Sequence, residues 1–264
     1  MEGTMDREHI DGIVLYRFEG LRAAKRLTHA ILTRIGGVSQ GPYATLNLGH
    51  TVGDDLSAVE ENHRRALGLL GLRPEGVVSP YQVHEGRVGV VGRAHLGTVQ
   101  PATDALVTAM PDVPLLMRFA DCTPILLFDP VRRAIGMAHA GWRGVVAGCA
   151  GAAVRTMTER LGCAPPDIWA GIGPTIGPCC YEVGSEVAEA VAAACPSGTE
   201  VVHRVNGRVH LDLPAGVAAQ LRAAGVDQVE NADLCTACCV NEFFSHRAER
   251  GRTGRFGVVM ELLE

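Results

Sequence analysis

The sequence predicts an α+β fold with mixed β-sheets and flanking helices. Strand-like and helix-like segments follow one another without the strict alternation that doubly wound and barrel α/β folds require. A chain of 264 residues is long for one domain and short for two, and neither an internal repeat nor a low-complexity linker divides it. We therefore expect one large domain over residues 1–264.

The composition is that of a globular protein with a full core, with 47% hydrophobic and 20% charged residues. No apolar stretch approaches the ~20 residues of a membrane-spanning helix, and the acidic N-terminal segment MEGTMDREHIDG is unlike a secretory signal. A formal charge of −5 argues against general nucleic-acid binding. These observations predict a cytoplasmic protein without nucleic-acid or membrane partners.

Short runs rich in Val, Ile, Leu and Met predict the strands. They lie at 12–18, 87–92, 104–108, 113–119, 124–128, 133–138, 167–173 and 255–263. The pair Asn206-Gly207 between alternating apolar residues predicts a hairpin over 201–213. The segment 32–55 is rich in Gly, Ser, Asn and Asp, which indicates a long loop.

Apolar periodicity with terminal signals predicts the helices, at 56–71, 145–162, 185–195 and 213–225. Ser57 and Glu60 have the spacing of an N-cap and its capping-box partner, and Ser185 is the expected N-cap of the third helix. Gly162 is the expected end of the second helix.

The run ADCTPILLFDPVRRAIGMAHAGWRG, 120–144, contains a cysteine and a histidine at opposite ends of two apolar segments. If Pro130 and Val131 form the connecting turn, the register places Cys122 opposite His139, with Cβ atoms ~5 Å apart. A Pro-led turn is not a favoured two-residue hairpin loop, so the register can differ by one or two residues. Both side chains still leave the hairpin at the same end, where they could share a metal ion or form a Cys–His ion pair.

Packing alone often explains a cysteine beside a histidine across two strands. Here Gly141 and Gly144 follow His139 and lead into a helix at about 145, so backbone N–H groups could face an anion. Arg143 lies within this turn. The convergence of a thiol, an imidazole, a guanidinium group and a helix end favours a functional site over packing.

Other motifs supply further candidates. His84 in YQVHEG would complete a Cys/His/His set, and three protein ligands with one open position are typical of catalytic zinc. Taken alone, His84 is an ordinary surface histidine. Arg34 precedes a glycine pair in TRIGGV, a pattern suited to phosphate or carboxylate but also to any turn.

The nine cysteines are an odd number in a chain without a signal peptide, which argues against a disulfide framework. We expect most of them to be small core residues. The run GIGPTIGPCCYEVG, 171–184, is compatible with a binding loop and with a mere connection in which Cys179 and Cys180 are buried. The motif CTACC, 235–239, shows no convincing partner pair for a four-ligand zinc site, so its cysteines are predicted to be core or incidental.

The motifs LTRIGGVS, YATLNLG, QVH, DALVT, ADCTPILLFD, AHAGWRG, GIGPTIGPCCYEVG, LDL, CT and FFSHRAERGRTGRF together resemble the YfiH/laccase-domain family, in order and over about residues 28 to 258. Proteins of this family are called purine nucleoside phosphorylases or polyphenol oxidases. The resemblance implies a YfiH-like fold similar to the catalytic domain of deamidating bacterial toxins, in which a Cys–His pair is nucleophile and base.

The resemblance implies that His84, Cys122 and His139 bind Zn²⁺, from the QVH, ADC and HAGWRG motifs. It also gives two groups of site candidates. They are Asp121, Cys122 and Arg143 as catalytic residues, and Arg34, Asn47, Gln82 and Arg143 as substrate-binding residues. His246 stands where tyrosine is common and Glu85 where glycine is common, which affects substrate preference only.

The implied enzyme is a zinc-dependent purine nucleoside phosphorylase for adenosine, inosine and methylthioadenosine, with adenosine deaminase activity. For deamination, zinc would activate a water molecule, with Asp121 either carrying a proton or orienting His84 or His139. Phosphorolysis needs a phosphate site, for which Arg34, Arg143 and the amides after His139 are candidates. The expected partners are a purine nucleoside and phosphate, and the expected state is a monomer or weak homodimer.

Three alternatives remain open at this stage. A copper polyphenol oxidase is the first, since Cu²⁺ can occupy the same ligands; the ten histidines contain no His-x-His pair, which speaks against a multicopper centre. The second is a thiol hydrolase editing peptidoglycan precursors, with Cys122 as nucleophile and His139 as base. Such a hydrolase would tolerate loss of His84, whereas a metal enzyme would not. The third is a binding protein with a structural zinc.

Overall fold

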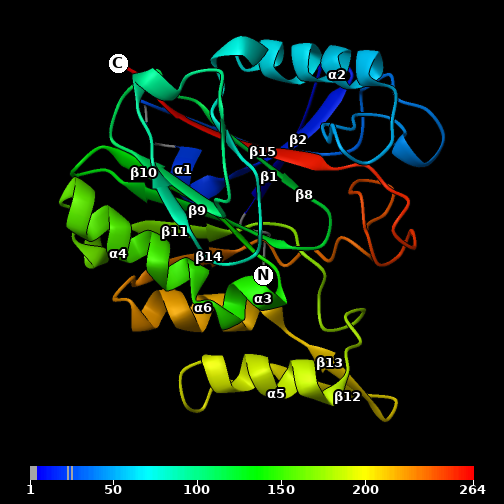
Figure 1. The fold of residues 1–264 in the computed structure, drawn as a ribbon, viewed down its shortest axis with the longest axis vertical. Helices are drawn as coiled ribbons and strands as arrows, with labels where there is room; N and C mark the ends of the chain where they lie inside the picture. Colours follow the sequence, from blue (N-terminus) through cyan, green and yellow to red (C-terminus); the bar gives the residue numbers. More distant parts are fainter. Residues whose placement is uncertain (1–4, 23, 25) are drawn as a thin grey trace.

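The computed structural model describes residues 5–22, 24 and 26–264, and it places two β-sheets face to face between layers of helices (Figure 1). The first sheet is antiparallel and has the order β1 (Met5–Ile10), β2 (Ile13–Phe18), β3 (Leu27–Leu32), β15 (Phe256–Leu262) and β8 (Leu115–Phe119). The second is mixed and has the order β14 (Gln228–Asn231), β11 (Trp169–Ile172), β9 (Thr123–Asp129), β10 (Ala134–Ala140), β7 (Ala105–Thr108) and β5 (Val88–Val90). The predicted α+β class with mixed sheets is confirmed.

Helices cover the outer faces of both sheets. Helix α2 (Leu56–Leu69) packs on the five-stranded sheet. The six-stranded sheet is covered by α3 (Trp142–Val146), α4 (Cys149–Leu161), α5 (Ser185–Ala194) and α6 (Leu213–Ala223). The remaining elements are α1 (Glu19–Arg22), the pair β4 (Ser79–Pro80) and β6 (Val99–Gln100), the hairpin β12 (Val202–Val205) and β13 (Arg208–Leu211), and short 3-10 turns at Gly41–Tyr43, Pro74–Gly76, Arg93–His95 and Pro165–Asp167.

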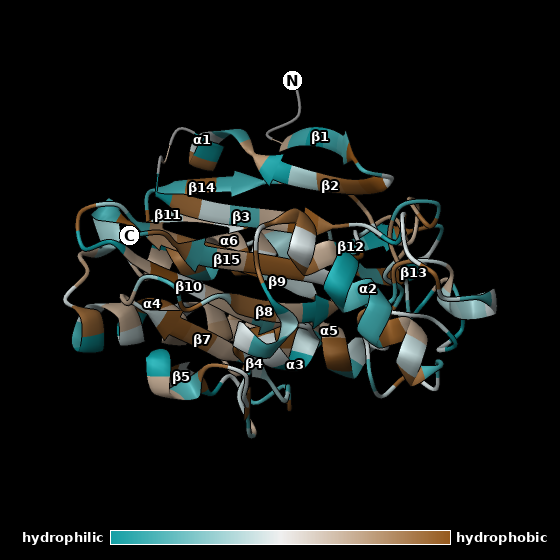
Figure 2. Ribbon diagram, turned by 90° about the horizontal axis from the view of Figure 1, so that it is seen from above, coloured by the Kyte–Doolittle hydropathy of each residue, from teal (hydrophilic) through white to brown (hydrophobic). Residues whose placement is uncertain are grey.

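Strand β9 shows how the sequence builds these layers. Leu126 belongs to the apolar cluster between the sheets, whereas Ile125 and Leu127 belong to the cluster under the helices. Alternate residues of a strand point to opposite faces, so a continuous apolar run is required where both faces are buried. Figure 2 shows the contrast with β1, whose residues are mainly hydrophilic at the sheet edge.

The helix ends differ from the prediction in detail. The N-cap of α2 is Asp55, whose side chain accepts a hydrogen bond from the Ser57 N–H at 3.0 Å, so Ser57 and Glu60 form no capping box. Gly184, and not Ser185, is the N-cap of α5. The predicted helix 145–162 is two helices, because Gly148 adopts φ 68° and interrupts it.

Five strands lie outside the predicted segments, namely β1, β3, β14 and the short pair β4 and β6. β1 is a polar edge strand that pairs with β2 through its backbone, so it lacks the apolar signature of a buried strand. The hairpin over 201–213 is confirmed, with Asn206 and Gly207 in the left-handed region between β12 and β13. Within the described residues, no helix combines the length and apolar character that crossing a membrane requires.

The predicted β9–β10 register is wrong by two residues. Asp129 pairs with Ala134, so the connection is 130–133, and its carboxylate accepts the backbone N–H groups of Val131 and Arg132 at 2.8 and 2.9 Å. His139 therefore pairs with Pro124, and Cys122 lies beyond the paired strand. A shift of two residues preserves which sheet face each side chain occupies, so both side chains still leave at the same end.

The buried carboxyl of Glu261 makes the stability of the fold depend on pH. This carboxyl lies on β15 with 7% of its surface exposed, and burial, reinforced by Asp112, raises its pKa to about 7. The folded protein therefore retains a proton that the unfolded chain loses above about pH 4.5. Stability due to this group is full below that pH, falls as the pH rises toward 7, and then levels off.

We expect Glu261→Gln to abolish this dependence. The melting temperature of the variant relative to that of the wild type should therefore rise between pH 5 and 8, by about 2–4 °C for each kcal/mol of stability that the wild type loses. The measurement is the melting temperature against pH, with exposed Glu189→Gln as the control that keeps the wild-type slope. Parallel slopes for Glu261→Gln and the wild type would contradict the assignment.

Candidate functional site

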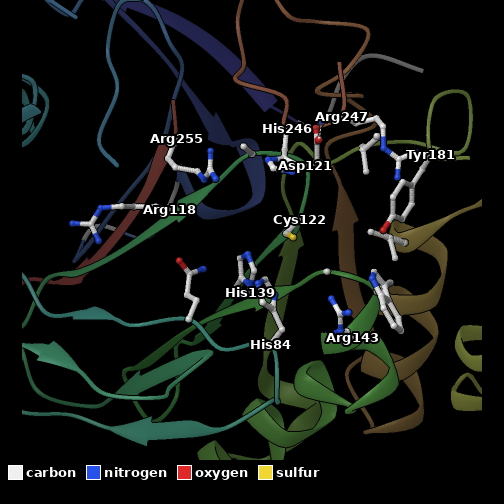
Figure 3. Close-up of a pocket in the computed structure, with 16 residues that line it drawn as sticks. His84, Arg118, Asp121, Cys122, His139, Arg143, Tyr181, His246, Arg247 and Arg255 are labelled. Atoms are coloured by element: carbon white, nitrogen blue, oxygen red, sulfur yellow. Dashed lines mark hydrogen bonds between the residues drawn. The ribbon is translucent and has the colours of Figure 1, made fainter. Parts of the chain in front are cut away.

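A cavity of about 490 Å³ opens beside the ends of β9 and β10, where Cys122 and His139 meet (Figure 3). Its wall combines residues that are far apart in the sequence. It is lined by Gln82, His84, Arg118, Ala120, Asp121, Cys122, His139, Gly141, Trp142, Arg143, Ile176, Tyr181, Leu213, His246, Arg247 and Arg255.

His84, Cys122 and His139 bring one thiol and two imidazoles together, with ligand atoms all within 4.8 Å of one another. The Nδ1 atom of His139 is buried and has no hydrogen-bond partner among the described residues. A Cβ atom added to Gly141 would lie 2.8 Å from the Cys122 sulfur, so a side chain at this position would displace the thiol. Because buried polar atoms are normally satisfied, the orphaned nitrogen and the donor set fit a metal ion.

Burial shifts the pKa values of both Cys122 and His139. Burial, with Asp121 adding to it, raises the pKa of the Cys122 thiol to about 12. Burial, followed by the neighbouring His84, lowers the pKa of His139 to about 3. Burial therefore disfavours both the thiolate and the imidazolium forms that a thiol hydrolase would use. A coordinating divalent cation would deprotonate the thiol.

Asp104 fixes the loop that carries His84. Its carboxylate accepts four backbone N–H groups, from Val83 and His84 at 2.8 and 2.7 Å and from Glu85 and Gly86 at 2.7 and 2.9 Å. Burial raises the pKa of Asp104, but these hydrogen bonds outweigh it and the net pKa is lowered. The Asp104 carbonyl also accepts the N–H of His139 at 2.8 Å. One residue thus connects two metal-ligand candidates.

Asp121 holds the opposite wall. Its carboxylate accepts hydrogen bonds from the Thr236 hydroxyl at 2.7 Å and the Arg247 N–H at 2.6 Å. Its carbonyl accepts from the Ile176 N–H at 3.0 Å and the Thr175 hydroxyl at 2.6 Å. Both carboxylate oxygens are therefore engaged, away from His84 and His139, which favours a positioning role over the proton transfer considered from the sequence.

The predicted substrate-binding residues divide into two groups. Gln82 and Arg143 line the cavity, and the Nε2 atom of Gln82 is buried without a partner among the described residues. Of the described residues, those lining the cavity do not include Arg34 or Asn47. The Arg34 guanidinium donates to two backbone carbonyls and to Glu249, and the Asn47 side-chain oxygen accepts the N–H of Arg255 at 2.8 Å. Both residues support the wall from behind.

Sequence reasoning missed most of the cationic lining. Arg118, Arg247 and Arg255 join Arg143 at the cavity, and among the described residues none of these four pairs with a carboxylate. Burial lowers the pKa of Arg118 to about 10 and also lowers that of Arg255. The motif FFSHRAERGRTGRF contains two of them but gives no sign of where its arginines point. The arrangement suits an anionic ligand.

Comparisons with known proteins agree with the architecture. A family model described as multi-copper polyphenol oxidoreductase laccase matches residues 28–262. Purine nucleoside phosphorylase YlmD of Geobacillus stearothermophilus is 39% identical over 236 residues, 85% of this chain and 86% of that protein. Purine nucleoside phosphorylase ORF3 of Streptomyces griseus is 44% identical over 227 residues, 86% of this chain and 90% of that protein.

Solved structures show the same fold. The crystal structure of YlmD from Geobacillus stearothermophilus matches with a TM-score of 0.93 and 36% identity, covering 99% of this chain and 100% of that one. The structure of the Bacillus licheniformis hypothetical protein YfiH matches with a TM-score of 0.90 and 33% identity, covering 96% and 97%.

Replacing the loop anchor should weaken metal binding. In Asp104→Asn one carboxylate oxygen becomes an N–H₂ group that faces two backbone donors, so the loop of His84 loses its fixed position. We expect metal affinity to fall by about 10–100-fold, as for other groups that orient ligands. Competition with a chromophoric chelator measures it. Asp129→Asn is the matched control, because Asp129 also accepts backbone N–H groups but in a remote turn; equal affinities for the two variants would refute the role of Asp104.

Proposed function

We propose that this chain, which belongs to the multi-copper polyphenol oxidoreductase laccase family, is a zinc-dependent purine nucleoside phosphorylase that also deaminates adenosine. The observation that carries the proposal is one cavity in which a Cys/His/His cluster faces four arginines that pair with no carboxylate among the described residues. The first feature suits a catalytic metal and the second suits phosphate. The names of the relatives, purine nucleoside phosphorylases, point in the same direction.

His84, Cys122 and His139 would hold the metal. Two nitrogens and one sulfur with the remaining side facing a cavity are the donor set of a catalytic zinc site, which leaves a position for substrate or water. When bound there, zinc supplies a Lewis acid. Cu²⁺ competes for nitrogen and sulfur donors, so the choice of zinc rests on this open three-ligand arrangement.

The protein's own residues would bind and orient both substrates. Arg118, Arg143, Arg247 and Arg255 offer guanidinium donors to inorganic phosphate. The Nε2 atom of Gln82, which has no hydrogen-bond partner among the described residues, offers donors to a carbonyl or hydroxyl of the nucleoside. For inosine, adenosine and methylthioadenosine the reacting bond is the one between C1′ of the ribose and the purine, so phosphate must approach C1′ from the arginine side. Adenosine deamination uses the same nucleoside position without phosphate.

The alternatives account for less of the cavity. A copper polyphenol oxidase is named in the family description, but the cluster offers two imidazoles and one thiol to a single ion, and a multicopper centre needs several such sets. A Cys–His hydrolase leaves His84 and its elaborate support by Asp104 without a purpose.

The direct test is His84→Ala. We expect the variant to lose one equivalent of metal and both inosine phosphorolysis and adenosine deamination to fall at least about 100-fold, because a Lewis acid contributes several kcal/mol. Elemental analysis and both assays are done on the same samples. His9→Ala, at an exposed edge position, is the control and should match the wild type. Full activity in a His84→Ala protein that lacks this metal would make Cys122 the nucleophile instead.

The phosphate assignment has a separate test. Arg143→Gln removes one guanidinium from the cavity, so we expect the KM for phosphate in inosine phosphorolysis to rise roughly tenfold. Adenosine deamination should change little, since it consumes no phosphate. Arg204→Gln, on the exposed hairpin, is the control. Equal losses in both reactions would show that Arg143 acts on the nucleoside or on the fold.

A further inference from the structure

Four cysteines converge outside the candidate active site. The sulfur atoms of Cys179, Cys180, Cys235 and Cys238 all lie within 4.8 Å of one another. Cys238 is the centre of the group, with its sulfur 3.5 Å from that of Cys179 and 3.4 Å from that of Cys180. The structure corrects two expectations from the sequence. The CTACC motif does have a partner, because the pair Cys179-Cys180 lies against it. These cysteines are not core residues either, since Cys179 and Cys238 are exposed and only Cys149 and Cys163 of the nine are buried.

The topology explains the convergence. Strands β11 and β14 are parallel neighbours, so the loops that follow them leave the sheet at the same end. The two loops then pair through a bridge between Thr175 and Cys235, in which the Thr175 N–H donates to the Leu234 carbonyl at 3.1 Å and the Thr236 N–H donates to the Thr175 carbonyl at 3.0 Å. The positions of the four cysteines are thus set by backbone pairing.

The sulfur spacing suits one tetrahedral ion. Zinc–sulfur bonds of ~2.3 Å place the sulfurs of a tetrahedral site about 3.8 Å apart, close to the separations around Cys238. A disulfide would need about 2.05 Å, and all four cysteines are free.

The surrounding backbone resembles that of a ligand loop. The Gly177 N–H donates to the Cys235 sulfur at 3.2 Å, and the N–H groups of Cys238 and Cys239 both donate to the Cys235 carbonyl, at 3.1 and 2.9 Å. This folds the Cys-x-x-Cys segment so that both of its sulfurs face the same point. Backbone donors to a ligand sulfur are the outer contacts that orient metal ligands.

We propose that Cys179, Cys180, Cys235 and Cys238 form a second metal site, a closed structural Zn²⁺ site with four thiolate ligands. Four cysteines around one tetrahedral position select zinc among the common divalent ions, and they leave no open position for a substrate. Binding displaces the four thiol protons to solvent. The site is distinct from the cluster of His84, Cys122 and His139 and shares no residue with it.

The site would fasten two loops that build the cavity wall. Ile176 and Tyr181 line the cavity on the first loop, and Tyr181 follows directly after the ligand Cys180. Thr236, between the ligands of the second loop, donates its hydroxyl to Asp121. A zinc ion joining the loops would therefore hold this wall in place from its outer side.

The test is zinc content after reconstitution with excess zinc under reducing conditions and removal of unbound metal. The wild type should retain two zinc ions per chain, Cys238→Ser one, His84→Ala one, and the double variant none. Cys195→Ser is the control, since this cysteine belongs to neither cluster, and should retain two. A Cys238→Ser protein that retains as many zinc ions as the wild type would overturn the proposal, whether or not the first site binds zinc.

X-ray absorption at the zinc edge tests the wild type without any substitution. With one sulfur ligand at the first site and four at the second, the average is about 2.5 sulfurs per zinc, whereas the first site alone gives about one. An iron–sulfur cluster, or a disulfide between the two loops in the reconstituted protein, would also overturn the assignment. Because the readout is metal content and ligation, it stands or falls independently of the nucleoside activities.

Discussion

The buried carboxylate of Asp104 is the interaction on which the rest of the site depends. It is fully shielded from solvent and forms no ion pair with a cationic side chain among the described residues, so its charge is balanced by four backbone N–H groups of the 83–86 loop. Hydrogen bonds to charged groups are worth about 1.5–3 kcal/mol each. The four hydrogen bonds together exceed the cost, about 1–3 kcal/mol, of holding His84 in the left-handed region at φ 63°. Without this anchor the His84 ring would have no defined place opposite His139.

Asp121 does for the other wall what Asp104 does for the first. It adopts φ 84° at the turn between β8 and β9, and it gathers donors from three separate loops, through Ile176, Thr236 and Arg247. Cys122, a candidate metal ligand, is the next residue, so the turn that fixes this wall also orients the thiol. The strand ends bring these loops near one another, and the hydrogen bonds of the Asp104 and Asp121 carboxylates then fix their positions.

The sequence predicted the features that depend on local pattern. Apolar runs gave the central strands, and glycine at 162 gave a helix end, because burial and backbone conformation act within a few residues. The convergence of Cys122 and His139 also followed, despite the wrong register, because an even shift leaves the faces unchanged. Asp104 did not follow, since nothing around it in DALVT indicates that its acceptors face a loop twenty residues earlier. The partner of the CTACC motif was missed for the same reason, because only the parallel pairing of β11 and β14 brings it close.

The cavity arginines complete the physical picture. Arg118 donates to the Leu48 carbonyl and Arg255 to the carbonyls of Thr253 and Gly254, so their contacts within the described chain are to neutral groups. A guanidinium removed from water and matched only by carbonyls loses solvation that an anion would restore. The lowered pKa values of both residues express this deficit. The cavity thus has an excess of positive charge next to the Cys/His/His cluster, which would add a further cation. An anionic ligand would both compensate this charge and replace the lost solvation of the arginines. Phosphate, with several oxygen acceptors for planar guanidinium groups, meets that requirement better than a neutral phenol does.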